Sequence, residues 1–162
     1  MVLTEIEKED RKLGKKLYDY QHGAIDLIFD HINSNPDNYN LLYQLPTGGG
    51  KTVIFSEIAR KYIATTGKKV LILTHRIELS KQTSQMLLEF GVSNKIIDSN
   101  VKVVSNDANF FCFVAMVETL NNRLKEGKVS LSDIGMVIVD EAHYNSFRKL
   151  FKYFEACFIL GV

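Results

Sequence analysis

The chain has 162 residues, of which 46% are hydrophobic and 24% charged, with 20 Lys and Arg against 19 Asp and Glu. This length suits one domain with a substantial core, and the composition excludes wholesale disorder. A net charge near zero provides no general electrostatic attraction for nucleic acid, so any such partner must be recognised at a local site. Residues 1–16 are rich in charge and are expected to form a solvated arm, which leaves 17–162 as the domain.

The sequence favours a cytoplasmic protein with no membrane partner. No run approaches the roughly 18 to 20 apolar residues of a membrane span, and the N-terminus lacks the apolar core of a signal peptide. Cys112 and Cys157 both lie in apolar runs, which is typical of small buried thiols and indicates a reducing compartment. The histidines and cysteines are too scattered for a zinc site.

Short apolar runs alternate with amphipathic stretches along the chain. The runs are apolar at both odd and even positions, as in strands buried on two faces, and the stretches have the three- and four-residue spacing of helices. The expected strands cover 40–44, 69–74, 110–117, 135–140 and 157–162. The expected helices lie near 20–33, 51–65, 76–90, 118–126 and 145–154. This alternation predicts an α/β fold with a three-layer, open, mostly parallel sheet and helices on both faces.

Glycines are placed where helices should stop. Gly67, Gly91 and Gly127 each follow an expected helix, and glycine relieves the left-handed conformation common at a helix C-terminus. The polar region 93–109 is expected to hold one short strand and a loop.

The segment QLPTGGGKT, residues 44–52, joins the first expected strand to a helix. Bare backbone there lets successive N–H groups point inward and form an anion site at the helix N-terminus. Lys51 would reach the β- and γ-phosphates of a nucleotide, and the Thr52 hydroxyl would ligate Mg²⁺. The backbone amides expected to line the cradle belong to Thr47, Gly48, Gly49 and Gly50.

A second cluster follows the apolar strand GMVIVD. Asp140 and Glu141 stand at its carboxyl end, which is where open α/β sheets place ligand chemistry. Asp140 can hold Mg²⁺, and Glu141 can polarise a water toward the γ-phosphate. A solvated strand end is the alternative for this pair taken alone.

QLPTGGGKT together with DEAH (140–143) resembles the first RecA-like motor domain of the second helicase superfamily, the DEAD/DEAH-type ATPases. The segment KLYDYQ, which ends at Gln21, is similar to one found in the branch that includes motor subunits of type I and III restriction enzymes. The resemblance implies ATP and Mg²⁺, with Lys51, Asp140 and Glu141 as catalytic residues. It also implies that Gln21 reads the adenine edge and that His143 couples the nucleotide site to a later motif.

The same resemblance implies a nucleic-acid contact. LILTHRIELSKQ (71–82) is similar to a family segment that faces a single-stranded backbone, so Thr74, His75 and Arg76 are candidates, and Thr119 is the candidate in a later, looser segment. For His75 and Arg76, mere surface positions after a strand are the alternative. DNA is favoured over RNA only through the likeness to restriction enzymes.

The family's third motif would follow residue 162, so the chain is expected to stop short of it and of the second RecA-like domain. In the implied topology 157–162 inserts between 40–44 and 135–140. Because the family completes its ATP site between two domains and adds an arginine finger, the chain alone is expected to bind ATP weakly and hydrolyse it barely. Two other readings stay open: a phosphotransferase acting on a small molecule, and a catalytically silent binding module.

Overall fold

The computed structural model describes residues 17, 19–34, 39–43, 50–98, 100, 104–105, 110–127, 129–130, 134–140, 150–154 and 156–162. Several predicted features lie outside these residues. They are the arm at 1–16, the part of the phosphate loop that holds Thr47, Gly48 and Gly49, and the positions of Glu141 and His143.

Six strands form an all-parallel sheet in the order β1-β8-β7-β2-β5-β3. The strands are β1 (Tyr39–Leu42), β2 (Lys69–Thr74), β3 (Asn94–Ile97), β5 (Cys112–Met116), β7 (Ile134–Val139) and β8 (Phe158–Gly161). All five predicted strands are present, and β8 lies between β1 and β7, as the family topology implied. Leu160 is paired with Leu41 on one side and Ile138 on the other.

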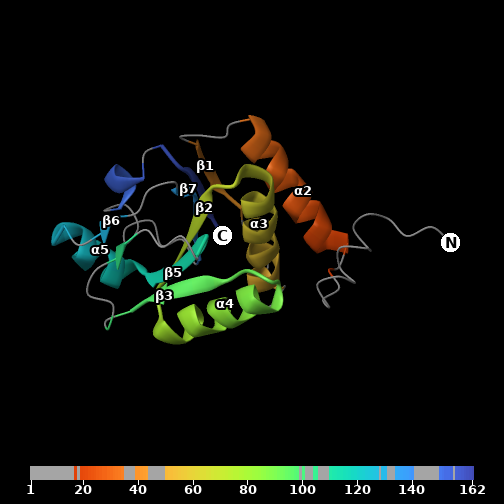
Figure 1. The fold of residues 1–162 in the computed structure, drawn as a ribbon. Coiled ribbons are helices and arrows are strands. Elements are labelled where there is room, and N and C mark those ends of the chain that lie inside the picture. Colours follow the sequence, from red (N-terminus) through yellow and green to blue (C-terminus); the bar gives the residue numbers. More distant parts are fainter. Residues whose placement is uncertain are drawn as a thin grey trace.

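Helices cover both faces of the sheet (Figure 1). They are α2 (Asp19–Ser34), α3 (Lys51–Thr66), α4 (Ile77–Glu89), α5 (Val117–Lys125) and the short 3-10 helix η1 (Phe151–Tyr153). Helices α2, α3 and α4 pack on one face, while α5 and the η1 region pack on the other. The first four expected helices are confirmed. Of the one expected near 145–154, the described part, 150–154, contains only η1.

The core has two halves because neighbouring residues of a strand point to opposite faces. Val70 and Ile72 of β2 join the half beneath α2, α3 and α4. Leu71 and Leu73 join the half beneath α5. All four side chains are fully buried. This double burial explains why the strands read as continuous apolar runs rather than as alternating patterns.

The region 93–109 holds more order than one strand and a loop. Besides β3, it contains the two-residue strand β4 (Val104–Ser105), which pairs in parallel with β6 (Val129–Ser130) in a separate small sheet. The predicted helix-ending glycines are confirmed, since Gly67, Gly91 and Gly127 have φ of 68°, 77° and 68°.

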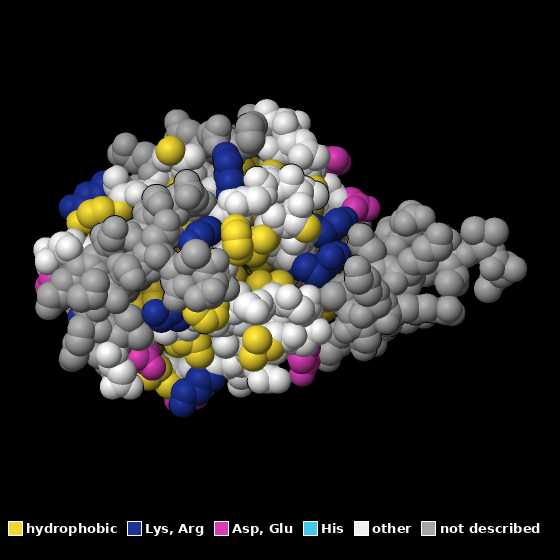
Figure 2. Space-filling view, viewed as in Figure 1, with side chains coloured by type: hydrophobic (Ala, Val, Ile, Leu, Met, Phe, Trp, Pro, Cys, Tyr) yellow, Lys and Arg dark blue, Asp and Glu magenta, His cyan; other side chains and the backbone are white. Residues whose placement is uncertain are grey.

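Both cysteines are buried free thiols, as predicted. Within the described ranges, no helix is both long and apolar enough to cross a bilayer. On the face shown in Figure 2, the Lys and Arg side chains that are drawn are dispersed rather than gathered into one stripe. The part of this face that is drawn in colour therefore shows no basic stripe of the kind that binds nucleic acid.

Candidate nucleotide-binding site

The candidate site lies at the carboxyl edge of the sheet, where β1 and β7 end on either side of β8. The ends of these strands are tied together by backbone hydrogen bonds. Tyr43 N donates to Gly161 O at 2.8 Å, and Val162 N donates to Val139 O at 3.1 Å. Helix α3 begins at Lys51, after the loop that follows β1. The fold thus brings the two predicted nucleotide segments to one edge of the sheet, as expected for parallel strands.

Lys51 and Asp140 form an ion pair across this edge, with Lys51 Nζ 2.9 Å from Asp140 Oδ1. The Lys51 side chain is 22% exposed and that of Asp140 only 8%. The backbone of Asp140 is fixed to the sheet, because its N–H donates to Leu73 O at 2.9 Å. A carboxylate this buried needs a charged or hydrogen-bonding partner, and Lys51 provides it.

Gly50 precedes α3 with φ 73° and ψ 35°, in the left-handed region. Its carbonyl accepts the first helical hydrogen bond from Ile54 N at 3.0 Å, and no side chain caps the helix start. Because the N-cap residue is glycine, it supplies no side chain of its own to the N–H groups of the first turn. Such groups, together with the helix dipole, favour an anion.

Gln21 lies directly against Gly50. The side-chain amide of Gln21 occupies the position that a Cβ on Gly50 would take, and the Tyr20 hydroxyl lies 3.9 Å from the same point. Gln21 is 3% exposed although it is polar. Helix α2 therefore places its one buried amide side chain beside the phosphate loop, and only glycine leaves room for it.

Thr52 is the second residue of α3 and is partly exposed. Asp140 and Thr52 offer a carboxylate and a hydroxyl, and oxygen ligands are those that Mg²⁺ prefers. Among the described ranges, no group of three or more His, Cys, Asp or Glu could hold a metal. Two oxygen donors from the protein would leave the other coordination positions of Mg²⁺ to water and phosphate oxygens, which is how this ion is usually bound.

The four candidate nucleic-acid residues lie at the carboxyl ends of two adjacent strands, β2 and β5. Thr74 ends β2, and Thr119 lies in the first turn of α5, directly after β5. Arg76 is exposed, and His75 and Thr119 are partly exposed. The Thr74 side chain is different because it is fully buried, and its hydroxyl lies 2.6 Å from the Ser80 hydroxyl. The sequence signal did not single out Ser80.

The opposite, amino edge of the sheet, where the strands begin, holds a hollow. Its volume is about 370 Å³, and it is lined by Arg60, Ile63, Ala64, Gly91, Val92, Ser93 and Phe111. The Arg60 guanidinium is held by Glu57, with Nε donating to Oε2 at 2.8 Å. Cys112 begins β5 nearby, and burial raises the pKa of its thiol to about 12. A thiol that stays protonated is a poor nucleophile, so Cys112 belongs to the core.

The chain matches one known protein family over most of its length. The sequence profile of the family described as "Type III restriction enzyme, res subunit" matches residues 14–162. The chain is also 34% identical over 149 residues to IRC3 of Saccharomyces cerevisiae, a protein that carries the name of an ATP-dependent helicase. That alignment covers 86% of this chain and 21% of IRC3, so the chain spans about a fifth of this relative's length.

Solved structures share the fold. Dbp5 of S. cerevisiae, bound to RNA and ADP BeF3, gives a TM-score of 0.71 at 17% identity, covering 99% of this chain and 44% of that one. The type ISP restriction-modification enzyme LlaGI, in complex with a DNA substrate mimic, gives 0.65 at 17% identity, covering 91% and 17%. Both likenesses establish a RecA-like α/β architecture at low sequence identity.

Proposed function

Because this chain belongs to the family of type III restriction enzyme res subunits, a family of helicase-type ATPase motor domains, we propose that residues 17–162 form an ATP-binding first motor domain. The longer protein would be a nucleic-acid-dependent ATPase, a helicase or translocase of restriction type. Residues 1–16 would be an arm outside the domain.

The ion pair between Lys51 and Asp140 carries this proposal. These residues come from segments far apart in the sequence, yet their charged atoms are 2.9 Å apart at the carboxyl edge of the sheet. A cation at a helix N-terminus beside a carboxylate is the arrangement that a phosphate group and its metal ion need. In an incidental surface ion pair both side chains would be well exposed, whereas the side chains of Lys51 and Asp140 are only 22% and 8% exposed.

In the nucleotide-bound protein, Lys51 would exchange its carboxylate partner for phosphate oxygens. Asp140 and the Thr52 hydroxyl are the residues that would hold Mg²⁺. When bound, Mg²⁺ would offset the charge of the phosphate oxygens. The backbone amides from Thr47 to Gly50 would cradle the phosphates. Glu141 would orient a water, and His143 would couple the site to the second motor domain.

Gln21 is proposed to recognise the base. Its buried amide carries a donor and an acceptor on one plane, which matches the adenine edge. The contact between Gln21 and Gly50 supports this role, because Gly50 belongs to the proposed phosphate-binding segment. Base and phosphate recognition would then be linked through one backbone position.

The nucleic-acid contact is proposed for His75, Arg76 and Thr119, at the carboxyl ends of the neighbouring strands β2 and β5. Phosphate contacts by Arg and by helix N-termini fix a backbone without reading its sequence. The structure of LlaGI holds a DNA substrate mimic and that of Dbp5 holds RNA. Family membership favours DNA here.

A titration with a fluorescent ATP analogue and Mg²⁺ tests the nucleotide site. We expect Lys51→Ala to weaken binding by roughly tenfold or more, because a charged hydrogen bond contributes about 1.5–3 kcal/mol. The control is Lys81→Ala, which removes an exposed lysine from α4 and should leave affinity unchanged. Melting curves of both variants separate lost binding from lost stability. Equal affinity of folded Lys51→Ala and wild type would refute the proposal.

The chain alone is proposed to hydrolyse ATP barely, since the family's site is completed by a second motor domain. Phosphate release measured with and without a single-stranded oligonucleotide checks this. Turnover strongly stimulated by nucleic acid in the 162-residue chain would contradict it.

A further inference from the structure

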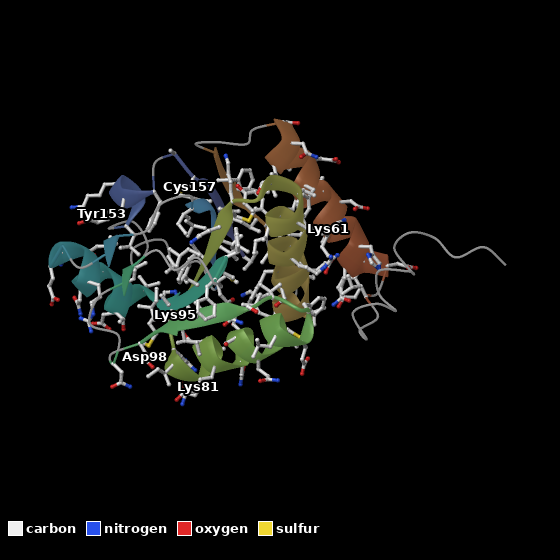
Figure 3. All side chains as sticks on the ribbon, viewed as in Figure 1. Lys61, Lys81, Lys95, Asp98, Tyr153 and Cys157 are labelled. Atoms are coloured by element: carbon white, nitrogen blue, oxygen red, sulfur yellow. The ribbon has the colours of Figure 1, made fainter. Side chains whose placement is uncertain are left out.

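Two buried hydroxyls hold the turn that carries the proposed nucleic-acid contact. Thr74 ends β2 and is 0% exposed, and Ser80 in the first turns of α4 is 2% exposed. Their oxygens are 2.6 Å apart. The burial of Ser80 places it on the inward face of α4, whereas the next residue, Lys81, points away from the helix into solvent (Figure 3).

Both hydroxyls also reach the same backbone atom. The carbonyl of Arg76 is 3.3 Å from Thr74 Oγ1 and 3.4 Å from Ser80 Oγ, and it accepts the Ser80 N–H at 3.1 Å. Two hydroxyls supply two protons. One proton joins the two side chains, so the other is left for the Arg76 carbonyl, whichever residue donates it.

This small network therefore fixes the backbone of the turn. Arg76 has extended dihedral angles, φ −131° and ψ 146°, and directly precedes α4. His75 and Arg76 are the two residues between the strand end and the helix start. These hydrogen bonds to the Arg76 carbonyl fix the position of the Arg76 backbone, from which the exposed Arg76 side chain extends into solvent.

We propose that Ser80 and Thr74 are positioning residues for Arg76, and that neither hydroxyl touches nucleic acid itself. This inference rests on the proposed function, because it concerns the same nucleic-acid contact. It changes the expected role of Thr74 from a direct phosphate ligand to a support. It also adds Ser80, which packs under the turn without reaching the surface.

The test measures binding of a fluorescein-labelled single-stranded oligodeoxynucleotide by anisotropy at several NaCl concentrations. Arg76→Ala should weaken binding and reduce the slope of log K against log salt by about 0.7, the effect of one lost phosphate contact on a single strand. Ser80→Ala and Thr74→Val should weaken binding several-fold and shift the slope in the same direction. Thr74→Ser retains the hydroxyl and should behave as wild type.

A double variant separates positioning from mere stability. If Ser80 acts through Arg76, Arg76→Ala combined with Ser80→Ala should bind no more weakly than Arg76→Ala alone. Additive losses, or a lower melting temperature of Ser80→Ala with an unchanged salt slope, would overturn the inference. An Arg76→Ala variant that binds like wild type would instead refute the proposed nucleic-acid contact.

Discussion

The two edges of the sheet each contain a glycine whose missing side chain leaves room for a neighbour, yet the neighbours differ in kind. At the carboxyl edge, Gly50 makes room for the buried amide of Gln21. At the amino edge, a Cβ on Gly135 would overlap the Tyr62 hydroxyl and come within 2.7 Å of the Lys68 side chain. One glycine admits a polar group beside a charged pair, and the other lets a strand and a helix pack closely.

The amino edge is otherwise built from contacts that join elements. The Lys69 ammonium lies 5.7 Å from the ring centres of both Phe111 and Phe113. Asn94 accepts a hydrogen bond from the Ser84 hydroxyl at 2.6 Å and thereby fastens β3 to α4. An ammonium–ring contact also joins α3 to α2, where Nζ of Lys61, labelled in Figure 3, lies 5.5 Å from the centre of the Phe29 ring. The comparison teaches that packing contacts between elements gather at the amino ends of the strands, while the candidate ligand-binding side chains lie at the carboxyl ends.

Gly135→Ala should break the amino edge while sparing the site. Tyr62 is 2% exposed and has little room to move, so we expect a loss of about 1–3 kcal/mol in unfolding free energy from overpacking. Urea denaturation measures this loss. Gly23→Ala is the matched control, because no atom lies within 4 Å of its Cβ position in α2. That helix substitution should stabilise the protein by roughly 0.5–1 kcal/mol. Equal stability of Gly135→Ala and wild type would contradict the packing argument.

Gly50→Ala should show the reverse pattern, with its main effect on the affinity for nucleotide rather than on stability. The left-handed conformation costs a non-glycine residue roughly 1–2 kcal/mol, and the new methyl group would displace Gln21. We expect a clear loss of affinity for the fluorescent ATP analogue, together with a stability loss at most comparable to that of Gly135→Ala. Affinity that stays at the wild-type value would show that the Gln21 contact is not part of the site.

Cys112 gives a smaller, pH-dependent effect within the core. Its folded pKa is raised to about 12 from the ordinary 9.0. Between these values the unfolded chain releases a proton that the folded chain keeps, so stability falls as pH rises above 9. At pH 10 the loss relative to pH 8 should be on the order of 1 kcal/mol, the effect of about one pH unit above the unfolded pKa. Denaturation of wild type and Cys112→Ala at both pH values checks this, since the variant should show a smaller decrease. Parallel decreases in the two proteins would exclude a role for the thiol.

The sequence was sufficient for the central strands of the main sheet because β2, β5, β7 and β8 are buried on both faces. Val70 to Leu73 have apolar residues at every position, a pattern that is hard to place in anything but an interior strand. The candidate nucleotide segments could be recognised because glycine, lysine and carboxylate at this spacing are the residue types that phosphate and Mg²⁺ binding require. The insertion of β8 between β1 and β7 came from family resemblance, since the chain's own pattern carries no strand order.

Other features had no readable signal. Strands β4 and β6 have two residues each, too few for periodicity. Thr74 is buried with its hydroxyl against that of Ser80, six residues later. From the sequence alone, a threonine at a strand end is equally consistent with a surface position. Gly135 is the second residue of the apolar strand β7, where its closeness to Tyr62 is set by the packing of α3 and not by its neighbours in sequence.

The position of β8 has a consequence for how the protein is made. Strand β1 is hydrogen-bonded to the rest of the sheet through β8, which is the last strand in chain order. On a ribosome, β1 must therefore wait through the synthesis of every other strand described in this structure before it can join them. The carboxyl end of β1 would then be fixed in the sheet later than those of β2, β5 and β7, and an early release of the growing chain would leave these three strands assembled while β1 lacks the strand that joins it to them.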